Sequence, residues 1–127
     1  MARITRRSFL QTTTAAGVGF WVAGGTRQAL SRSVNERPNV ACIGVGGKGG
    51  SDSNNAAEFG NVIAICDVDR NTLENKGKAD KFKDAEQFTD FRELLAKHGK
   101  NIQIATISTP DHMHAPATLE AMRLGIS

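Results

Sequence analysis

The chain has 127 residues, 39% of them hydrophobic, with 13 Gly, 2 Cys and a formal net charge of +3. This length allows one ordinary domain at most, and the composition excludes collagen-like, disulfide-dense and wholly disordered chains. The positive charge lies near the N-terminus, because residues 38–127 carry 10 basic and 12 acidic side chains, a balance of −2. A body without a basic stripe cannot neutralise a phosphate backbone, so nucleic acid is not an expected partner.

Residues 1–35 are predicted to be an export signal followed by a linker. The motif at residues 5–11, Thr-Arg-Arg-Ser-Phe-Leu-Gln, resembles the twin-arginine signal and departs from its pattern only at Gln11. The compact apolar stretch at residues 15–23 has the size of a signal-peptide apolar region and is too short to cross a bilayer. We therefore expect the twin-arginine export machinery as a partner and a periplasmic or other extracytoplasmic location. An uncleaved leader would anchor the protein in the membrane, and a chance arginine pair is the alternative.

Pro38 marks the start of a regular alternation of apolar runs and helical segments. Strands are predicted at residues 40–43, 62–66 and 102–108, and helices over residues 51–59, 70–82 and 90–98. A last helix is predicted to begin at Pro116 and to end at Gly125. Its Leu119 and Met122 are expected to face inward. Strands this apolar need cover on both faces, which predicts an α/β fold with a doubly wound parallel sheet of the Rossmann type, incomplete at its last strand.

Single residues support these elements. Asp69 and Asp90 stand where a side chain can cap the following helix, and His98 is expected on the inner face of its helix. Cys42 and Cys66 fall on neighbouring strands and are predicted to be free thiols in the core. A sheet that lacks a strand leaves an edge uncovered, so a homo-oligomer is among the expected partners.

A glycine-rich turn follows the first strand and precedes a helix. In this setting Gly44-x-Gly46-x-x-Gly49 predicts dinucleotide binding. The glycines permit a tight turn, let the backbone approach a pyrophosphate and allow close packing of helix on strand, while the helix N-terminus attracts phosphate. Gly47 and Lys48 lie within the turn and complete the predicted pyrophosphate site. The turn is not a P-loop, because Gly49 stands where Ser or Thr would bind Mg²⁺.

Asp67 ends the second predicted strand, 18 residues after Gly49. A carboxylate there can accept hydrogen bonds from an adenosine ribose, although it could equally cap a helix. It would also repel a 2′-phosphate, which predicts NAD in preference to NADP, while Arg70 could swing toward such a phosphate. A methyltransferase that uses S-adenosylmethionine carries similar features, so the glycines and the acid alone leave that alternative open.

The segment at residues 106–117, Thr-Ile-Ser-Thr-Pro-Asp-His-Met-His-Ala-Pro-Ala, is the third motif. Together with the glycine turn and residues 65–69, Ile-Cys-Asp-Val-Asp, it resembles the glucose-fructose oxidoreductase / inositol dehydrogenase (Gfo/Idh/MocA) family of nicotinamide-dependent enzymes. The resemblance covers residues 38–127. The chain is also similar to an exported branch of that family, which carries a twin-arginine leader and a Thr-Pro-Asp-His-x-His-Ala-Pro segment. Met113 stands where that branch often has an aromatic residue.

This resemblance implies that the motif glycines hold the pyrophosphate of NAD and that Asp67 holds the ribose. Thr109, Pro110 and His114 would line the nicotinamide side of the cofactor. The family transfers hydride between nicotinamide and a sugar, cyclitol or related polyol, which a second, C-terminal domain binds. That domain and the catalytic lysine, in a Glu-Lys-Pro motif, are expected beyond Ser127. The chain is therefore predicted to be the N-terminal part of an oxidoreductase, with a non-catalytic nucleotide-binding module or an inactive fragment as the alternative.

Asp111, His112 and His114 also raise the question of a metal site. Two imidazoles on an extended segment can lie on one side and bind a metal. No further His or Cys cluster completes a coordination shell in the sequence, so no metal is predicted.

Overall fold

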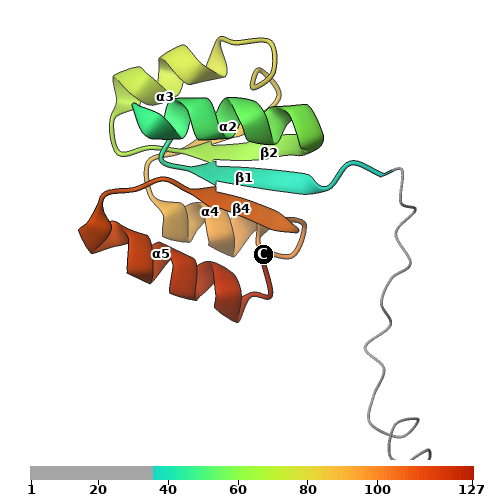
Figure 1. Cartoon of the computed structure of the whole chain (residues 1–127), viewed down its shortest axis with the longest axis vertical. Coiled ribbons are helices and arrows are strands. Elements are labelled where there is room, and N and C mark those ends of the chain that lie inside the picture. Colours follow the sequence, from blue (N-terminus) through green and yellow to red (C-terminus); the bar gives the residue numbers. More distant parts are fainter. Residues whose placement is uncertain (1–35) are drawn as a thin grey trace, which may run out of the picture. The chain divides into compact units, whose positions relative to one another are not determined.

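The computed structural model describes residues 36–127, so the leader predicted for residues 1–35 lies outside the described residues. Strands and helices alternate along the described chain (Figure 1). The elements are β1 (Asn39–Ile43), α2 (Lys48–Phe59), β2 (Asn61–Cys66), α3 (Arg70–Gly77), β3 (Glu86–Phe88), α4 (Phe91–His98), β4 (Ile104–Ile107) and α5 (Asp111–Arg123). The strands pair in the order β3-β2-β1-β4, and every pair is parallel.

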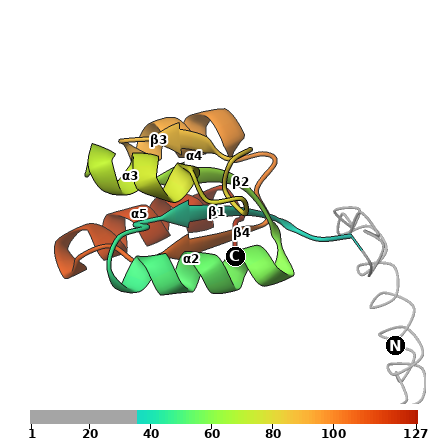
Figure 2. The ribbon, with the colours of Figure 1, turned by 90° about the horizontal axis from the view of Figure 1, so that it is seen from above.

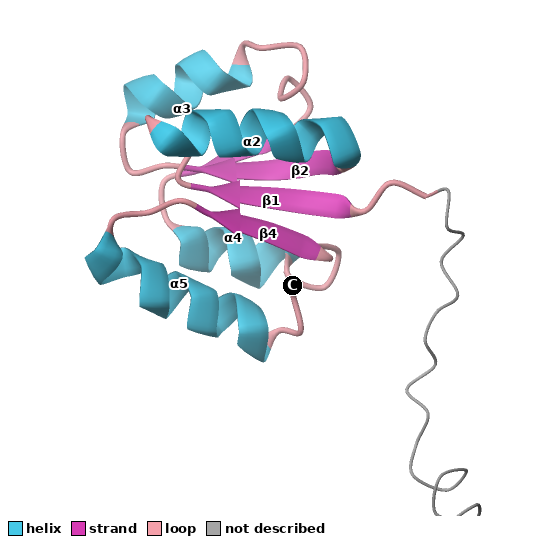
Figure 3. Ribbon diagram, in the orientation of Figure 1, coloured by secondary structure: helices cyan, strands magenta, loops and turns pink. Residues whose placement is uncertain are grey.

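The sheet lies between two layers of helices, as the secondary-structure colours make plain (Figure 3). Helices α2 and α3 cover one face, and α4 and α5 cover the other (Figure 2). The chain runs outward from β1 through β2 to β3 and then crosses to the other side of β1 to form β4. The predicted doubly wound parallel sheet is thereby confirmed, and the point where the strand order reverses lies beside β1.

The two core clusters take alternate residues of β1. Val40 and Cys42 of β1 pack with Leu73 and Phe82 under α2 and α3. Residues of the opposite parity, such as Ile43, pack under α4 and α5. This alternation follows from the two-residue side-chain period of a strand.

The two cysteines lie on opposite faces of the sheet. Cys42 belongs to the cluster under α2 and α3, and Cys66 to the cluster under α4 and α5. Both are buried and free, which confirms the prediction of core thiols.

Two helices begin earlier than the sequence predicts. Helix α2 starts at Lys48, three residues before the expected start, and α5 starts at Asp111. The start predicted at Pro116 is wrong because Pro110 is already the N-cap, and its carbonyl accepts hydrogen bonds from Met113 N at 2.9 Å and His114 N at 3.0 Å. Pro116 lies inside the helix, where it removes one backbone donor.

The face that α5 packs against the sheet also differs from the prediction. Leu119 and Met122, expected to face inward, are 53% and 67% exposed. Ala117 and Ala121 are buried instead, four residues apart on the same face of the helix. Small side chains at these positions let α5 pack close to the sheet, while Leu119 and Met122 stay outside and Met113 packs against the core.

Strand β3 is absent from the sequence-based assignment. Its three residues, Glu-Gln-Phe, contain no apolar run, and it lies at the edge of the sheet. Helix α3 ends at Gly77 instead of residue 82, and turns lead from there to β3. Phe82 lies in a turn but is only 1% exposed. The sequence predicts a longer helix because the apolar side chain of Phe82 fits its buried end.

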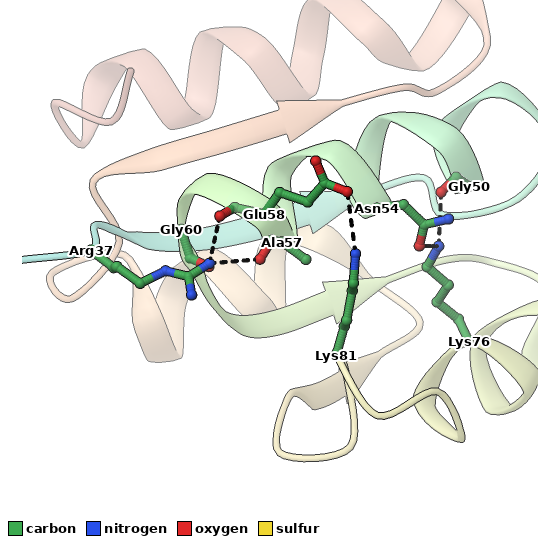
Figure 4. Close-up of polar contacts among 8 residues, drawn as sticks. All are labelled: Arg37, Gly50, Asn54, Ala57, Glu58, Gly60, Lys76 and Lys81. Carbon is green, nitrogen blue, oxygen red and sulfur yellow. Dashed lines mark hydrogen bonds and ion pairs between the residues drawn. The ribbon is translucent and has the colours of Figure 1, made fainter.

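Helix α2 is intrinsically weak, because glycine and short polar side chains dominate its first half. Contacts from outside the helix support it (Figure 4). At its C-terminal end, Arg37 Nη2 donates to the carbonyls of Ala57 and Glu58, each at 2.8 Å, and to that of Gly60 at 3.1 Å. A cation at the C-terminus of a helix satisfies free carbonyls and complements the helix dipole.

The end of the chain lies along the open side of β4. Ser127 N donates to Gln103 O at 3.0 Å, and Ala105 N donates to Ser127 O at 2.8 Å. Within residues 36–127, no helix combines the length and apolar character needed to cross a bilayer.

Candidate functional site

A cavity of about 730 Å³ lies at the carboxyl ends of the strands, beside the point where the strand order reverses. Crevices at this position are the usual ligand sites of open parallel sheets. Four parts of the chain line the cavity: the turn after β1, the end of β2, the residues that lead into α4, and the segment between β4 and α5.

The glycines of the turn after β1 occupy positions that exclude side chains. Gly44 has φ +83°, and a Cβ there would lie 2.5 Å from the Ser108 carbonyl oxygen. A Cβ on Gly49 would run into the Gly44 carbonyl, so the start of α2 can approach β1 only without a side chain. These are the tight turn and the close helix-strand packing expected of the motif.

The N-terminus of α2 has the properties of an anion site. Its N-cap is Gly47, with φ +51°, no side chain caps the helix, and its first turn contains no acid. A Cβ on Gly47 would meet nothing within 4 Å, so the approach to the first-turn N–H groups is open. Uncapped N–H groups at a helix N-terminus suit a pyrophosphate, and the residues present therefore fit the cofactor.

Lys48 is the first residue of α2, and its side chain is 82% exposed. Its ammonium pairs with Asp52 at 3.0 Å, and Asp52 in turn accepts a hydrogen bond from Ser108 Oγ at 2.8 Å. These two hydrogen bonds, that from Lys48 first, lower the pKa of Asp52.

Asp67 follows β2 and faces the glycine turn. Its Oδ2 accepts hydrogen bonds from Val45 N at 2.9 Å and Gly46 N at 3.1 Å, and its Oδ1 accepts one from Asp69 N at 3.0 Å. Asp67 does not cap α3, because Asp69 does so as predicted, accepting from Asn71 N at 3.0 Å. The carboxylate predicted for the ribose thus also shapes the turn predicted for the pyrophosphate, a link that the sequence pattern does not reveal.

The segment between β4 and α5 forms another wall of the cavity. Thr109 and Pro110 line it, and the Thr109 hydroxyl oxygen is buried with no hydrogen-bond partner among the described residues. An unpaired buried hydroxyl costs free energy. His114 is exposed on α5 and does not line the cavity, whereas His112 and Met113 do.

Residues that the sequence analysis missed complete the site. The cavity is also lined by Val68, which is 87% exposed, and by residues 89–92. Residues 89–92 follow β3, a strand that the sequence analysis did not predict because it is short and polar. Across residues 36–127, no group of three or more His, Cys, Asp or Glu side chains could hold a metal ion.

The family model described as an oxidoreductase family with an NAD-binding Rossmann fold, GFO_IDH_MocA, matches residues 38–127. A curated relative, a glycosyl hydrolase family 109 protein of Saccharopolyspora erythraea, is 30% identical over 95% of this chain. The match covers 31% of that relative, so the chain spans about a third of its length.

Solved structures share the fold at low sequence identity. UDP-N-acetylglucosamine 3-dehydrogenase GnnA from Acidithiobacillus ferrooxidans has a TM-score of 0.59 at 20% identity, over 71% of this chain and 28% of that one. The WlbA dehydrogenase of Chromobacterium violaceum, solved with NADH and UDP-GlcNAcA, has a TM-score of 0.59 at 18% identity. This match covers 73% of this chain and 26% of WlbA. RSP, a Rex-family repressor, has a TM-score of 0.56 at 18% identity, and the match covers 90% of this chain and 49% of RSP.

These structural neighbours establish the fold alone, whereas the family model spans nearly the whole described part of the chain and sets the methyltransferase alternative aside. The chain belongs to the Gfo/Idh/MocA oxidoreductase family and contains its NAD-binding Rossmann domain.

Proposed function

We propose that the chain is the NAD-binding part of an exported oxidoreductase that transfers hydride between nicotinamide and a carbon of a sugar, cyclitol or related polyol. The observation that carries the proposal is the cavity itself. It places the glycine turn, Asp67 and the unpartnered hydroxyl of Thr109 at one edge of the sheet. The pyrophosphate, the adenosine ribose and the nicotinamide of a dinucleotide would occupy these separate parts of the site.

Each part of the site has a role in this proposal. The first turn of α2 receives the pyrophosphate, and Asp67 accepts from an adenosine ribose hydroxyl while it keeps its bonds to the turn. Thr109 and Pro110 border the nicotinamide side, and His112 takes the place in the wall that we had expected for His114. When bound, NAD supplies the hydride acceptor or donor.

The carbohydrate substrate rests on the names of similar proteins. The curated relative is named a glycosyl hydrolase, GnnA is named a dehydrogenase of UDP-N-acetylglucosamine, and WlbA was solved with UDP-GlcNAcA. These names support sugars within the proposed class. The 30% identity to the first relative also favours a second candidate, hydrolysis of a glycoside.

One experiment separates these functions. The natural gene product, including any sequence that follows Ser127, is purified and supplied with NAD and a panel of sugars, cyclitols and nitrophenyl glycosides. NADH formation with free sugars or cyclitols supports the oxidoreductase, and nitrophenol release supports the hydrolase. Tight NADH binding without either product would favour the non-catalytic module.

The cofactor preference follows from the same site. A 2′-phosphate would approach the Asp67 carboxylate, whereas a free hydroxyl would donate to it. We therefore propose that NADH binds more tightly than NADPH, which calorimetric titration with both cofactors measures. Tighter NADPH binding would mean that Arg70 or another cation outweighs Asp67.

Export is the remaining part of the proposal. Arg6 and Arg7 precede a short apolar stretch, the pattern of a twin-arginine leader. Replacing both with lysine should trap a folded reporter in the cytoplasm, whereas replacing Arg27 and Arg32 should not. Equal export with and without the pair would refute the assignment.

A further inference from the structure

The weakest part of α2 is its first turn, which is also the part that faces the pyrophosphate. Gly49 and Gly50 lie in this turn, and a glycine in a helix costs about 1 kcal/mol relative to alanine. No side chain caps the turn. Besides the hydrogen bond from Ser108 Oγ to Asp52, one further contact from another element holds this backbone in place when no cofactor is bound.

Lys76 of α3 makes that contact (Figure 4). Its Nζ donates to the Gly50 carbonyl at 2.8 Å and to Asn54 Oδ1 at 2.9 Å. The ammonium also lies 4.5 Å from the centre of the Phe82 ring, which is buried. One side chain thus ties the first two turns of α2 to α3.

Lys76 carries a charge that its partners leave unneutralised. Both acceptors are uncharged, and the described residues contain no carboxylate that pairs with it. Burial lowers the pKa of the ammonium, which means that the surroundings oppose the charge. A cation near the N-terminus of a helix is also opposed by the helix dipole.

Two other cations contact α2 from outside the helix, and both occupy positions that the dipole favours, whereas Lys48 within its first turn is paired with Asp52. Arg37 binds the carbonyls at the C-terminal end, and Lys81 pairs with Glu58 at 3.4 Å near that same end (Figure 4). Lys76 alone among these three lies at the opposite end. The position of Lys76 becomes favourable when an anion is bound at the start of α2, because the ammonium then attracts that anion.

We propose that Lys76 is a positioning residue for NAD: it holds the first turn of α2 in the form that receives the pyrophosphate and adds positive charge behind it. The proposal rests on cofactor binding by this family's fold and does not depend on the substrate or on export. It adds a residue outside the glycine motif to the cofactor site.

Ligands of different charge test the proposal. Lys76→Gln and Lys76→Arg are made in the full chain, and Lys81→Met is the matched control, since it removes a cation from the other end of the same helix. Affinities for NADH, ADP and adenosine are measured by calorimetry at low and high ionic strength. Lys76→Gln should weaken NADH and ADP binding about tenfold but adenosine binding by less than about twofold. Its NADH affinity should also depend less on salt.

The controls separate charge from packing. Lys76→Arg keeps the cation and should stay within about threefold of the wild type for NADH, and Lys81→Met should stay within about twofold. Equal losses for adenosine and ADP in Lys76→Gln would show a merely structural role and overturn the proposal. Unchanged NADH affinity would overturn it as well.

Hydrogen exchange supplies a test that needs no ligand. In Lys76→Gln, the amides of residues 48–54 should exchange faster than in the wild type, because the first turn loses its tie to α3. The same amides should be unaffected in Lys81→Met. Wild-type exchange rates in Lys76→Gln would contradict the positioning role.

Discussion

The carboxylate of Asp67 binds the backbone of the glycine turn and is also the group proposed to bind the ribose. Three backbone N–H groups already donate to it, two of them from the glycine turn. A carboxylate has about four acceptor sites, so it retains room for one more strong donor. At the level of single residues, the ribose contact and the shape of the pyrophosphate turn therefore depend on the same side chain.

This double role predicts that Asp67→Asn destabilises the protein even without a cofactor. The amide NH₂ group cannot accept the hydrogen bonds that one carboxylate oxygen now accepts, and Val45 N lies in the buried interior. Leaving such donors unpaired should lower the free energy of unfolding by about 1 to 2 kcal/mol. Urea denaturation measures the change, with the exposed Asp84→Asn as control, expected within about 0.5 kcal/mol of the wild type. Equal stability of the two variants would contradict the role assigned to the turn.

Part of the site could be predicted from the sequence because some of its positions accept only one type of residue. Gly44 and Gly49 tolerate no side chain, and this requirement appears directly as a motif. The role of His114 was implied by the family resemblance alone, and the cavity wall contains His112 and Met113 but not His114. The hydrogen bonds of Asp67 and Lys76 depend on segments folding side by side, which no local pattern records.

At the level of elements, Glu86 fastens α4 to the edge strand β3. His98 Nε2 lies 2.7 Å from Glu86 Oε2, and Lys97 Nζ binds the other carboxylate oxygen. The ring of His98 also meets Phe88 edge to face, which accounts for its half-buried, inward position. Hydrogen bonds from Lys97 and then from His98 hold the pKa of Glu86 below its usual range.

This arrangement predicts an acid-sensitive attachment. A carboxyl group whose pKa is lower in the folded state stabilises the fold above its unfolded pKa, and this contribution disappears as pH falls through the folded value. Glu86→Gln should therefore lower the melting temperature at neutral pH, and the difference from the wild type should shrink in acid. Glu120→Gln, which alters a surface pair within α5, is the control. A pH-independent difference for Glu86→Gln would rule out an electrostatic attachment.

The elements that could be predicted are those with strong local signals. Strands β1 and β2 are apolar after a first asparagine, and α4 has a cap followed by regularly spaced buried residues. Strand β3 could not be found this way, because its pairing with β2 and its contacts with α4 hold a sequence that has no strand character of its own.

At the level of the whole molecule, cover is uneven. Among residues 36–127, only Ser127 hydrogen-bonds along the side of β4 away from β1, and Ile104 is 39% exposed. A groove of about 570 Å³ runs between α4 and α5, with Leu119 and Leu124 in its walls. The homo-oligomer expected from an uncovered edge stays a prediction, which sedimentation of the full chain can measure.

Because Cys42 and Cys66 lie on opposite faces of the sheet, the folded chain is expected to keep both thiols reduced in either a reducing or an oxidising compartment. Burial raises the pKa of both thiols, that of Cys66 to about 12 with help from the neighbouring Asp67, so neither presents a reactive thiolate at neutral pH. A layer of backbone stands between them, and no side-chain motion within the fold can join them. An oxidant such as diamide should therefore cross-link Cys42 to Cys66 only in denaturant, as mass spectrometry would detect; a disulfide in the folded chain would contradict this. A protein that folds in a reducing compartment and works in an oxidising one would pass between them with its covalent structure unchanged.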